Sequence, residues 1–228
     1  MGGMAWLLLL MAVKGASGDA AEAETWVGQY VQEGLRQVPL SGKKEVHTET
    51  FVVAQVRRSD GQLDFTEHVC RIQVRPVKGV TVTMSPNTIA HLPPTKFTLS
   101  VHDGQVSGGP WTSGWGAEDL DRDGHPGVTV HVGGTFCSGD LYVSSETRTS
   151  LTSGQIKDSQ LSGLLSGLVR QRVLGADGLC LRSMAGDSQE VQMGTIAYRR
   201  VASDTTCQSL AGKPWPVHAA PVKGTSSK

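Results

Sequence analysis

The sequence predicts an all-β fold in which about nine strands close into an antiparallel barrel. Apolar and polar residues alternate with a period of two over many short segments, turn residues such as Asp60-Gly61 separate those segments, and the connections between them are short. A chain made almost entirely of strands must hide its sheet edges, and closure into a barrel does so most completely. A sandwich of two sheets is the alternative.

The individual strands follow from this alternation, which is clearest at 96–102, where Phe97 and Leu99 are flanked by polar residues. The pair Asp60-Gly61 supplies the positive φ of a tight turn and predicts a hairpin between 51–57 and 63–74. The apolar residues of 63–74 change parity, which predicts a β-bulge near 67–69. Further strands are expected at 26–30, 80–84, 128–132 and 141–143.

The segment 161–168 fits two structures. Its leucines lie at positions i, i+3, i+4 and i+7, as on one face of an amphipathic helix. Gly163 and Gly167 would each cost such a helix about 1 kcal/mol relative to alanine, and residues 170–174 alternate again. We therefore predict a strand, with a helix as the alternative.

The two ends of the chain differ in composition from its middle. Residues 5–13 are apolar and residues 15–18 are small, a pattern too short to span a bilayer but typical of a signal peptide. A short buried helix is the alternative. We expect cleavage after Gly18, a secreted or periplasmic protein, and one domain over 19–210. Residues 211–228 are rich in proline and small polar residues and predict a flexible tail.

The four cysteines, Cys70, Cys137, Cys180 and Cys207, are an even number in a chain expected to be exported. They predict two disulfides, because their spacing lacks the close pairs of a structural zinc site. Four cysteines allow three pairings. We expect Cys180 to pair with Cys207, which closes the shortest loop, and Cys70 to pair with Cys137.

Composition and motifs exclude several function classes. The chain carries 21 basic and 21 acidic residues and has a net charge of zero, so it lacks the basic stripe of a nucleic-acid-binding protein. It has no phosphate-binding loop, no dinucleotide-binding glycine motif and no nucleophile elbow. No catalytic residues, no nucleic-acid partner and no membrane span are expected. An enzyme whose site is assembled from distant residues is the alternative.

Two tryptophans, Trp111 and Trp115, lie in the glycine-rich segment 108–116. The glycines predict a loop, from which the indoles would cap the barrel mouth or stack on a ligand such as a sugar ring. The alternative is that both rings fold back over the core as a plug.

The acidic segment 119–130 predicts a calcium site. Aspartates stand at positions 1, 3 and 5 of the segment and glycine at position 6, as in loops that curl around Ca²⁺. Val130 replaces the bidentate glutamate at position 12, so the affinity is expected to be low. The alternative is an acidic turn whose carboxylates accept local backbone N–H groups. The expected ligands are the side chains of Asp119, Asp121 and Asp123 and the carbonyl oxygen of His125.

Three family resemblances accompany these patterns. Residues Trp26-Val27-Gly28-Gln29-Tyr30 resemble the start of a lipocalin or avidin-type barrel, although the lipocalin motif places its glycine two positions before the tryptophan. The segment 119–130 resembles the calcium loops of EF-hand, dockerin and FG-GAP proteins. Together with Tyr142-Val143 and 173–176 it also resembles a set of uncharacterised exported bacterial proteins. The resemblances imply a calycin-like barrel and export, and they imply no activity.

These observations lead to a function hypothesis. We expect an exported, non-enzymatic barrel that binds a small apolar or glycan ligand and carries a structural calcium ion. The alternative is a structural or surface-interaction protein with a fully packed barrel. Inward-facing residues distinguish the two, because large apolar side chains fill a barrel whereas small or polar ones leave a cavity.

Overall fold

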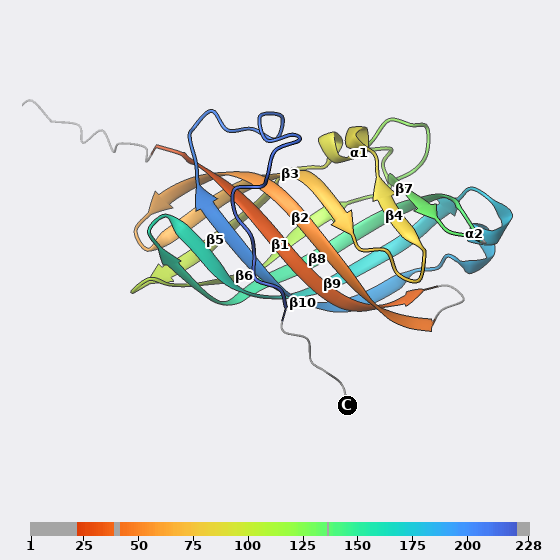
Figure 1. The fold of residues 1–228 in the computed structure, drawn as a ribbon, viewed down its shortest axis with the longest axis horizontal. Coiled ribbons are helices and arrows are strands. Elements are labelled where there is room, and N and C mark those ends of the chain that lie inside the picture. The colour runs from red at the N-terminus through yellow and green to blue at the C-terminus, as the bar shows by residue number, and fades with distance from the viewer. Residues whose placement is uncertain (1–21, 39–41, 136, 223–228) are drawn as a thin grey trace, which may run out of the picture.

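A computed structural model describes residues 22–38, 42–135 and 137–222 (Figure 1). The expected signal peptide, 1–18, lies outside these residues. The described part contains two short helices, α1 (Pro86–His91) and α2 (Leu179–Met184), and neither has the length and hydrophobicity needed to cross a bilayer. Its strands are β1 (Glu24–Val38), β2 (Gly42–Ser59), β3 (Gln62–Val74), β4 (Thr81–Met84), β5 (Thr95–His102), β6 (Gln105–Trp115), β7 (Val128–Gly133), β8 (Gly139–Lys157), β9 (Gln160–Ala176) and β10 (Ser188–Arg200).

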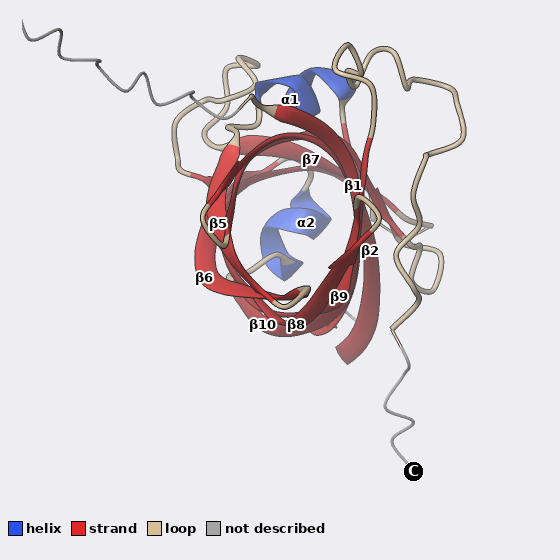
Figure 2. Ribbon diagram, turned by 90° about the vertical axis from the view of Figure 1, so that its left-hand side faces the viewer, coloured by secondary structure: helices blue, strands red, loops and turns tan. Residues whose placement is uncertain are grey.

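All the strands pair in one antiparallel sheet with the order β4-β7-β8-β6-β5-β3-β2-β1-β10-β9. An additional pairing of β8 with β9 closes eight of them into a ring, which Figure 2 shows from one end. The long strand β8 pairs with β7 along its first residues and with β6 along the rest, so β7 and β4 extend the wall at one end of the ring. The prediction of an all-β fold is confirmed.

The predicted hairpin at Asp60-Gly61, the strand over 161–174 and the β-bulge are all present, although the bulge is displaced. The register of β2 and β3 shifts where Phe51 faces Arg71 and Val52 faces Val69, so the extra residue of the bulge is Cys70. The bulge therefore lies just beyond the expected segment, 67–69.

One half of the barrel is packed with large apolar side chains. In this half, which holds the β2–β3, β5–β6 and β8–β9 hairpins, the rings of Phe65 and Phe97 stack with centroids 4.8 Å apart. Phe97 in turn stacks on Trp111 at 4.4 Å. Leu63 and Leu99 are fully buried beside them. Burial of these side chains is the main source of stability for the ring.

The other half of the barrel is built differently, because the inward residues become small or polar along several strands, although β3 keeps Val69, Ile72 and Val74 there. On β8, the buried Leu151 is followed toward the other end by Thr149, Thr147 and Ser145 on the same face. On β1, Trp26 lies in the core, whereas Gln32 lines a cavity. The wall is therefore continuous, but its interior is only partly filled.

Residues 201–222 run along the outside of the barrel as a strap, drawn in dark blue in Figure 1. Its Trp215 packs edge-to-face on Phe51, with ring centroids 5.3 Å apart, and its indole N–H donates to the carbonyl oxygen of Gly28 at 3.0 Å. The sequence predicted a flexible tail from residue 211. Residues 211–222 are instead packed, because Trp215 and Ala219 cover apolar side chains on the outer face of β1 and β2.

All four cysteines form disulfides, as expected, but the predicted pairing is wrong. Cys70 pairs with Cys207, with Cα atoms 5.2 Å apart, and Cys137 pairs with Cys180, with Cα atoms 5.9 Å apart. The bulge turns Cys70 toward the outer face, where the strap carries Cys207. The other bridge ties α2 to the loop between β7 and β8. Loop length alone predicted neither arrangement.

Candidate functional site

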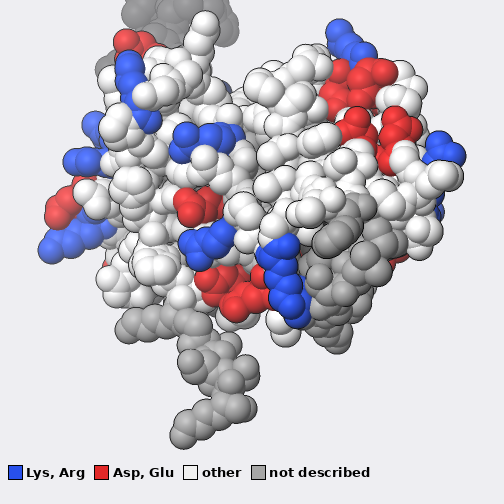
Figure 3. Space-filling model, turned by 45° about the vertical axis from the view of Figure 1, so that its right-hand side comes forward, with Lys and Arg blue, Asp and Glu red and all other residues white. Residues whose placement is uncertain are grey.

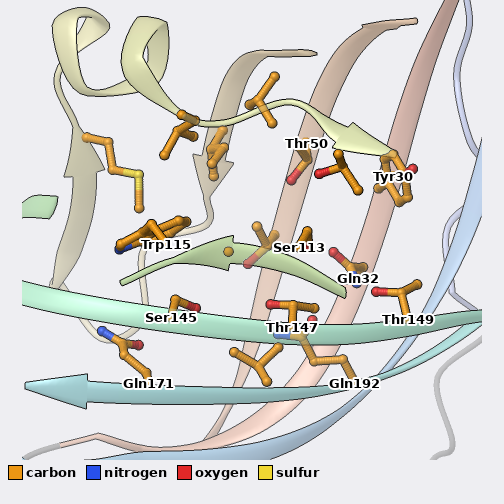
Figure 4. Close-up of a pocket in the computed structure, with 18 of the residues that line it drawn as sticks. Tyr30, Gln32, Thr50, Ser113, Trp115, Ser145, Thr147, Thr149, Gln171 and Gln192 are labelled. Atoms are coloured by element: carbon orange, nitrogen blue, oxygen red, sulfur yellow. The ribbon is translucent and has the colours of Figure 1, made fainter. Parts of the chain in front are cut away.

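The hollow half of the barrel encloses an inner cavity of about 220 Å³. Figure 4 shows hydroxyl and amide side chains from several strands pointing into it. The labelled groups include Gln32 of β1, Thr50 of β2, Ser113 of β6, Thr147 of β8 and Gln171 of β9. These side chains offer both hydrogen-bond donors and acceptors.

A second cavity, of about 330 Å³, lies toward the end of the barrel that α2 occupies. Its lining is mostly aliphatic, and Leu181 of α2 forms part of it. Val74, Val82, Val130 and Gln171 line both cavities. The two cavities are therefore adjacent, and we treat them as one chamber, whose inner part is lined by polar and apolar side chains together and whose mouth is mostly aliphatic. Two charged residues, Arg75 and Asp187, also line the mouth. Its other aliphatic residues are Val46, Val77, Val80, Val132, Leu141, Val173 and Ala185.

The two tryptophans line the inner cavity, but they do so from a strand. Segment 108–116, expected as a loop, belongs largely to β6. Trp111 is buried against Phe97, and the indole N–H of Trp115 donates to the carbonyl oxygen of Val143 at 2.9 Å. Gly114, at φ +142°, allows β6 to approach β8 closely, because an added Cβ would collide with the backbone of Ser145. Both rings are fixed parts of the cavity wall.

Glu67 is the carboxylate at the packed end of the inner cavity. Its Oε2 lies 2.9 Å from the hydroxyl of Tyr30 and also bonds the hydroxyl of Tyr198. The two hydroxyls are 2.8 Å apart, so the three groups form a closed triangle. Burial raises the pKa of Glu67 to about 7, and the hydrogen bonds from the two tyrosines only partly oppose this effect.

A count of protons indicates the protonation state that suits this triangle. With Glu67 ionised, the two tyrosine hydrogens must serve three contacts, and one contact between oxygens is left without a hydrogen. With Glu67 protonated, each of the three contacts has its own hydrogen. The geometry therefore favours the neutral acid, in agreement with the raised pKa.

Glu67 was not among the predicted site residues. Its position in the strand could have indicated its burial, because Glu67, Phe65 and Leu63 are spaced two residues apart and therefore lie on the same, buried face. A carboxylate on the buried face of a strand is rare unless it is paired or has a functional role.

The acidic segment brings Asp119, Asp121 and Asp123 together, with one carboxylate oxygen of each within 4.8 Å of the others. Asp119 accepts the backbone N–H groups of Asp123 and Gly124 at 3.1 and 3.0 Å. The fourth expected ligand, His125, donates its backbone N–H to Asp123 and stacks its ring on Tyr142 at 4.0 Å. An acidic turn without a metal ion, the alternative to a calcium site, would also have these hydrogen bonds between carboxylates and local backbone N–H groups.

Comparisons with known proteins add little to this geometry. No family model and no curated protein match the chain, so the family resemblances stay predictions. The ywiB protein from Bacillus subtilis aligns at 12% identity with a TM-score of 0.27, covering 82% of this chain and 100% of that one. OccK2 (OpdF) from Pseudomonas aeruginosa aligns at 12% identity with a TM-score of 0.17, covering 77% of this chain and 61% of that one. Likeness at this level carries no argument about function.

Proposed function

We propose that the protein is an exported, non-enzymatic barrel that binds one small, uncharged, amphiphilic ligand in its chamber. The observation that carries this proposal is the gathering of hydroxyl and amide groups among the apolar side chains of the inner cavity, next to a mouth that is mostly aliphatic. Ligand sites of this kind combine an apolar lining with a few polar groups that fix orientation.

The inner cavity matches the polar end of such a ligand. Hydroxyl and amide groups, among them Gln32, Thr147 and Gln171, surround it, and the indole of Trp115 offers a flat face beside them. A sugar-like or hydroxylated head group would satisfy these donors and acceptors. A structural barrel without a ligand is the second candidate, but large apolar side chains would then be expected at these inward positions.

The charge distribution supports an uncharged ligand. Among the described residues that line the inner cavity, Glu67 is the only carboxylate, and no lysine, arginine or histidine lies there. An anionic group in the inner cavity would have no cation beside it, since Arg75 lies at the mouth, and an unpaired charge is costly in a buried site. On the outside, basic side chains are scattered over the face drawn in Figure 3 and form no continuous stripe.

The lining also supports a binding role over catalysis. Among the described residues, the ionisable side chains of the inner cavity are those of Glu67 and Tyr30, which are bonded to each other, and those of the mouth are Arg75 and Asp187. General acid–base or nucleophilic chemistry needs a group free to approach a substrate. Export is supported by the two disulfides, which form and persist in oxidising compartments.

A dye-binding experiment tests the proposal. N-phenyl-1-naphthylamine, an uncharged apolar dye, is expected to gain fluorescence on saturable binding to the wild type, and octyl glucoside is expected to displace it. Ser145 lines the inner cavity, so Ser145→Phe should fill the space and weaken dye binding by about tenfold or more, a change of about 1.4 kcal/mol.

Ser144→Phe is the matched control, because Ser144 lies on the same strand with its side chain on the opposite face. This variant should bind the dye like the wild type, and circular dichroism should show that both variants are folded. Equal dye affinity in the wild type and in Ser145→Phe would contradict binding inside the chamber.

A further inference from the structure

The loop between β6 and β7 gathers three carboxylates around one point. One oxygen from each of Asp119, Asp121 and Asp123 lies within 4.8 Å of the others. Oxygens that bind the same Ca²⁺ at 2.3–2.6 Å lie at most about 5 Å apart. The three side chains are therefore close enough to share one calcium ion.

Asp121 supplies a second and independent observation. It is only 3% exposed, which is rare for an aspartate. Its Oδ2 accepts the hydroxyl of Thr88 at 2.7 Å and the backbone N–H of Thr129 at 3.1 Å. Its Oδ1 is buried and has no hydrogen-bond partner among the described residues. A buried carboxylate oxygen without a partner costs the free energy of its lost hydration, and a bound cation would recover that cost.

We propose that Asp119, Asp121 and Asp123 bind one Ca²⁺, with Oδ1 of Asp121 among the ligands. The donor set is made of hard oxygens, which favour calcium over softer transition metals. Asp119 and Asp123 are exposed, so water can complete the coordination shell.

The place of this site gives the ion a structural role beyond ligand binding. Asn87 of α1 donates to the carbonyl oxygen of Asp121 at 2.9 Å, and Thr88 of α1 donates to its carboxylate. Just after α1, Leu92 and Pro93 line the inner cavity. Calcium at Asp121 would therefore fasten the loop and α1 together as one cover beside the chamber.

Thermal unfolding tests the site. Millimolar Ca²⁺ is expected to raise the Tm of the wild type by about 2–4 °C over the chelator-treated protein, and Mg²⁺ at the same concentration should have a smaller effect. Asp121→Asn and Asp119→Asn should each abolish the Ca²⁺ shift. Asp119 is exposed, so its variant is expected to fold even if loss of the Asp121 charge prevents folding.

Asp103→Asn is the charge-matched control. Asp103 lies in the β5–β6 turn with its side chain 89% exposed, and this variant should keep the full Ca²⁺ shift. The proposal is wrong if Ca²⁺ and chelator give the same wild-type Tm, or if Asp119→Asn responds to Ca²⁺ like the wild type. A loss of the shift in Asp103→Asn would also contradict a local site. The dye experiment is independent of all these outcomes.

Discussion

Trp215→Ala is expected to lower the free energy of unfolding by about 3–5 kcal/mol, the usual cost of truncating a buried tryptophan. The indole is 8% exposed and holds the strap against the outer face of the barrel. Its removal leaves a cavity beside Phe51 and Val27 and leaves the carbonyl oxygen of Gly28 without its indole donor. Urea unfolding with both disulfides intact would measure the change.

Two further substitutions separate packing from hydrogen bonding. Trp215→Phe should lose less stability than the alanine variant, because the ring contact with Phe51 is largely kept while the N–H donor is lost. Pro214→Ala, at an exposed neighbouring position, should change stability by less than about 1 kcal/mol. A Trp215→Ala variant as stable as Pro214→Ala would show that the strap does not stabilise the barrel.

The second large effect is expected from Glu67 and depends on pH. An unfolded glutamate releases its proton near the ordinary pKa of 4.5, whereas the pKa of Glu67 in the folded protein is raised to about 7. Between these values the folded state holds the additional proton. Its stability should therefore fall by about 1.4 kcal/mol per pH unit as the pH rises from about 5 to 7, and then level off.

Glu67→Gln cannot ionise, so this contribution to the slope should be absent from its unfolding free energy. Relative to the wild type, the unfolding free energy of the variant should rise by about 3 kcal/mol between pH 5 and pH 8. Urea unfolding at each pH would measure this difference. Asp64→Asn is the control, because Asp64 lies on the exposed face of β3. A wild-type slope that persists in Glu67→Gln would assign the pH dependence to other groups.

The ring of strands was predictable, because its cause is local. Period-two alternation places Phe97 and Leu99 on one face wherever the strand lies in the sheet. The leucine pattern of 161–168 was ambiguous, and the glycines correctly favoured a strand. The strap was not predictable in this way. Trp215 stands among prolines and small polar residues, and its burial depends on an apolar outer face that is distant in sequence.

The chamber could be predicted only in part. Trp111 and Trp115 were singled out as aromatic residues in a glycine-rich segment, and both line the cavity, although from a strand. No pattern in the sequence indicated that polar residues line the cavity. Inward residues such as Thr147 and Ser145 have the composition of an exposed strand face, so only the closed ring shows that they face the interior.

The two disulfides are nested, since the bridge between Cys137 and Cys180 lies inside the loop closed by Cys70 and Cys207. A chain that emerges from its N-terminus presents Cys70 first and Cys137 second, and a bond between them would be non-native. The native partner of Cys70 arrives 137 residues later. An oxidised chain with that early bond reaches its native state only by thiolate attack and exchange. A chain that forms this early bond in an oxidising compartment therefore needs a free thiol or a disulfide isomerase to reach the native pairing.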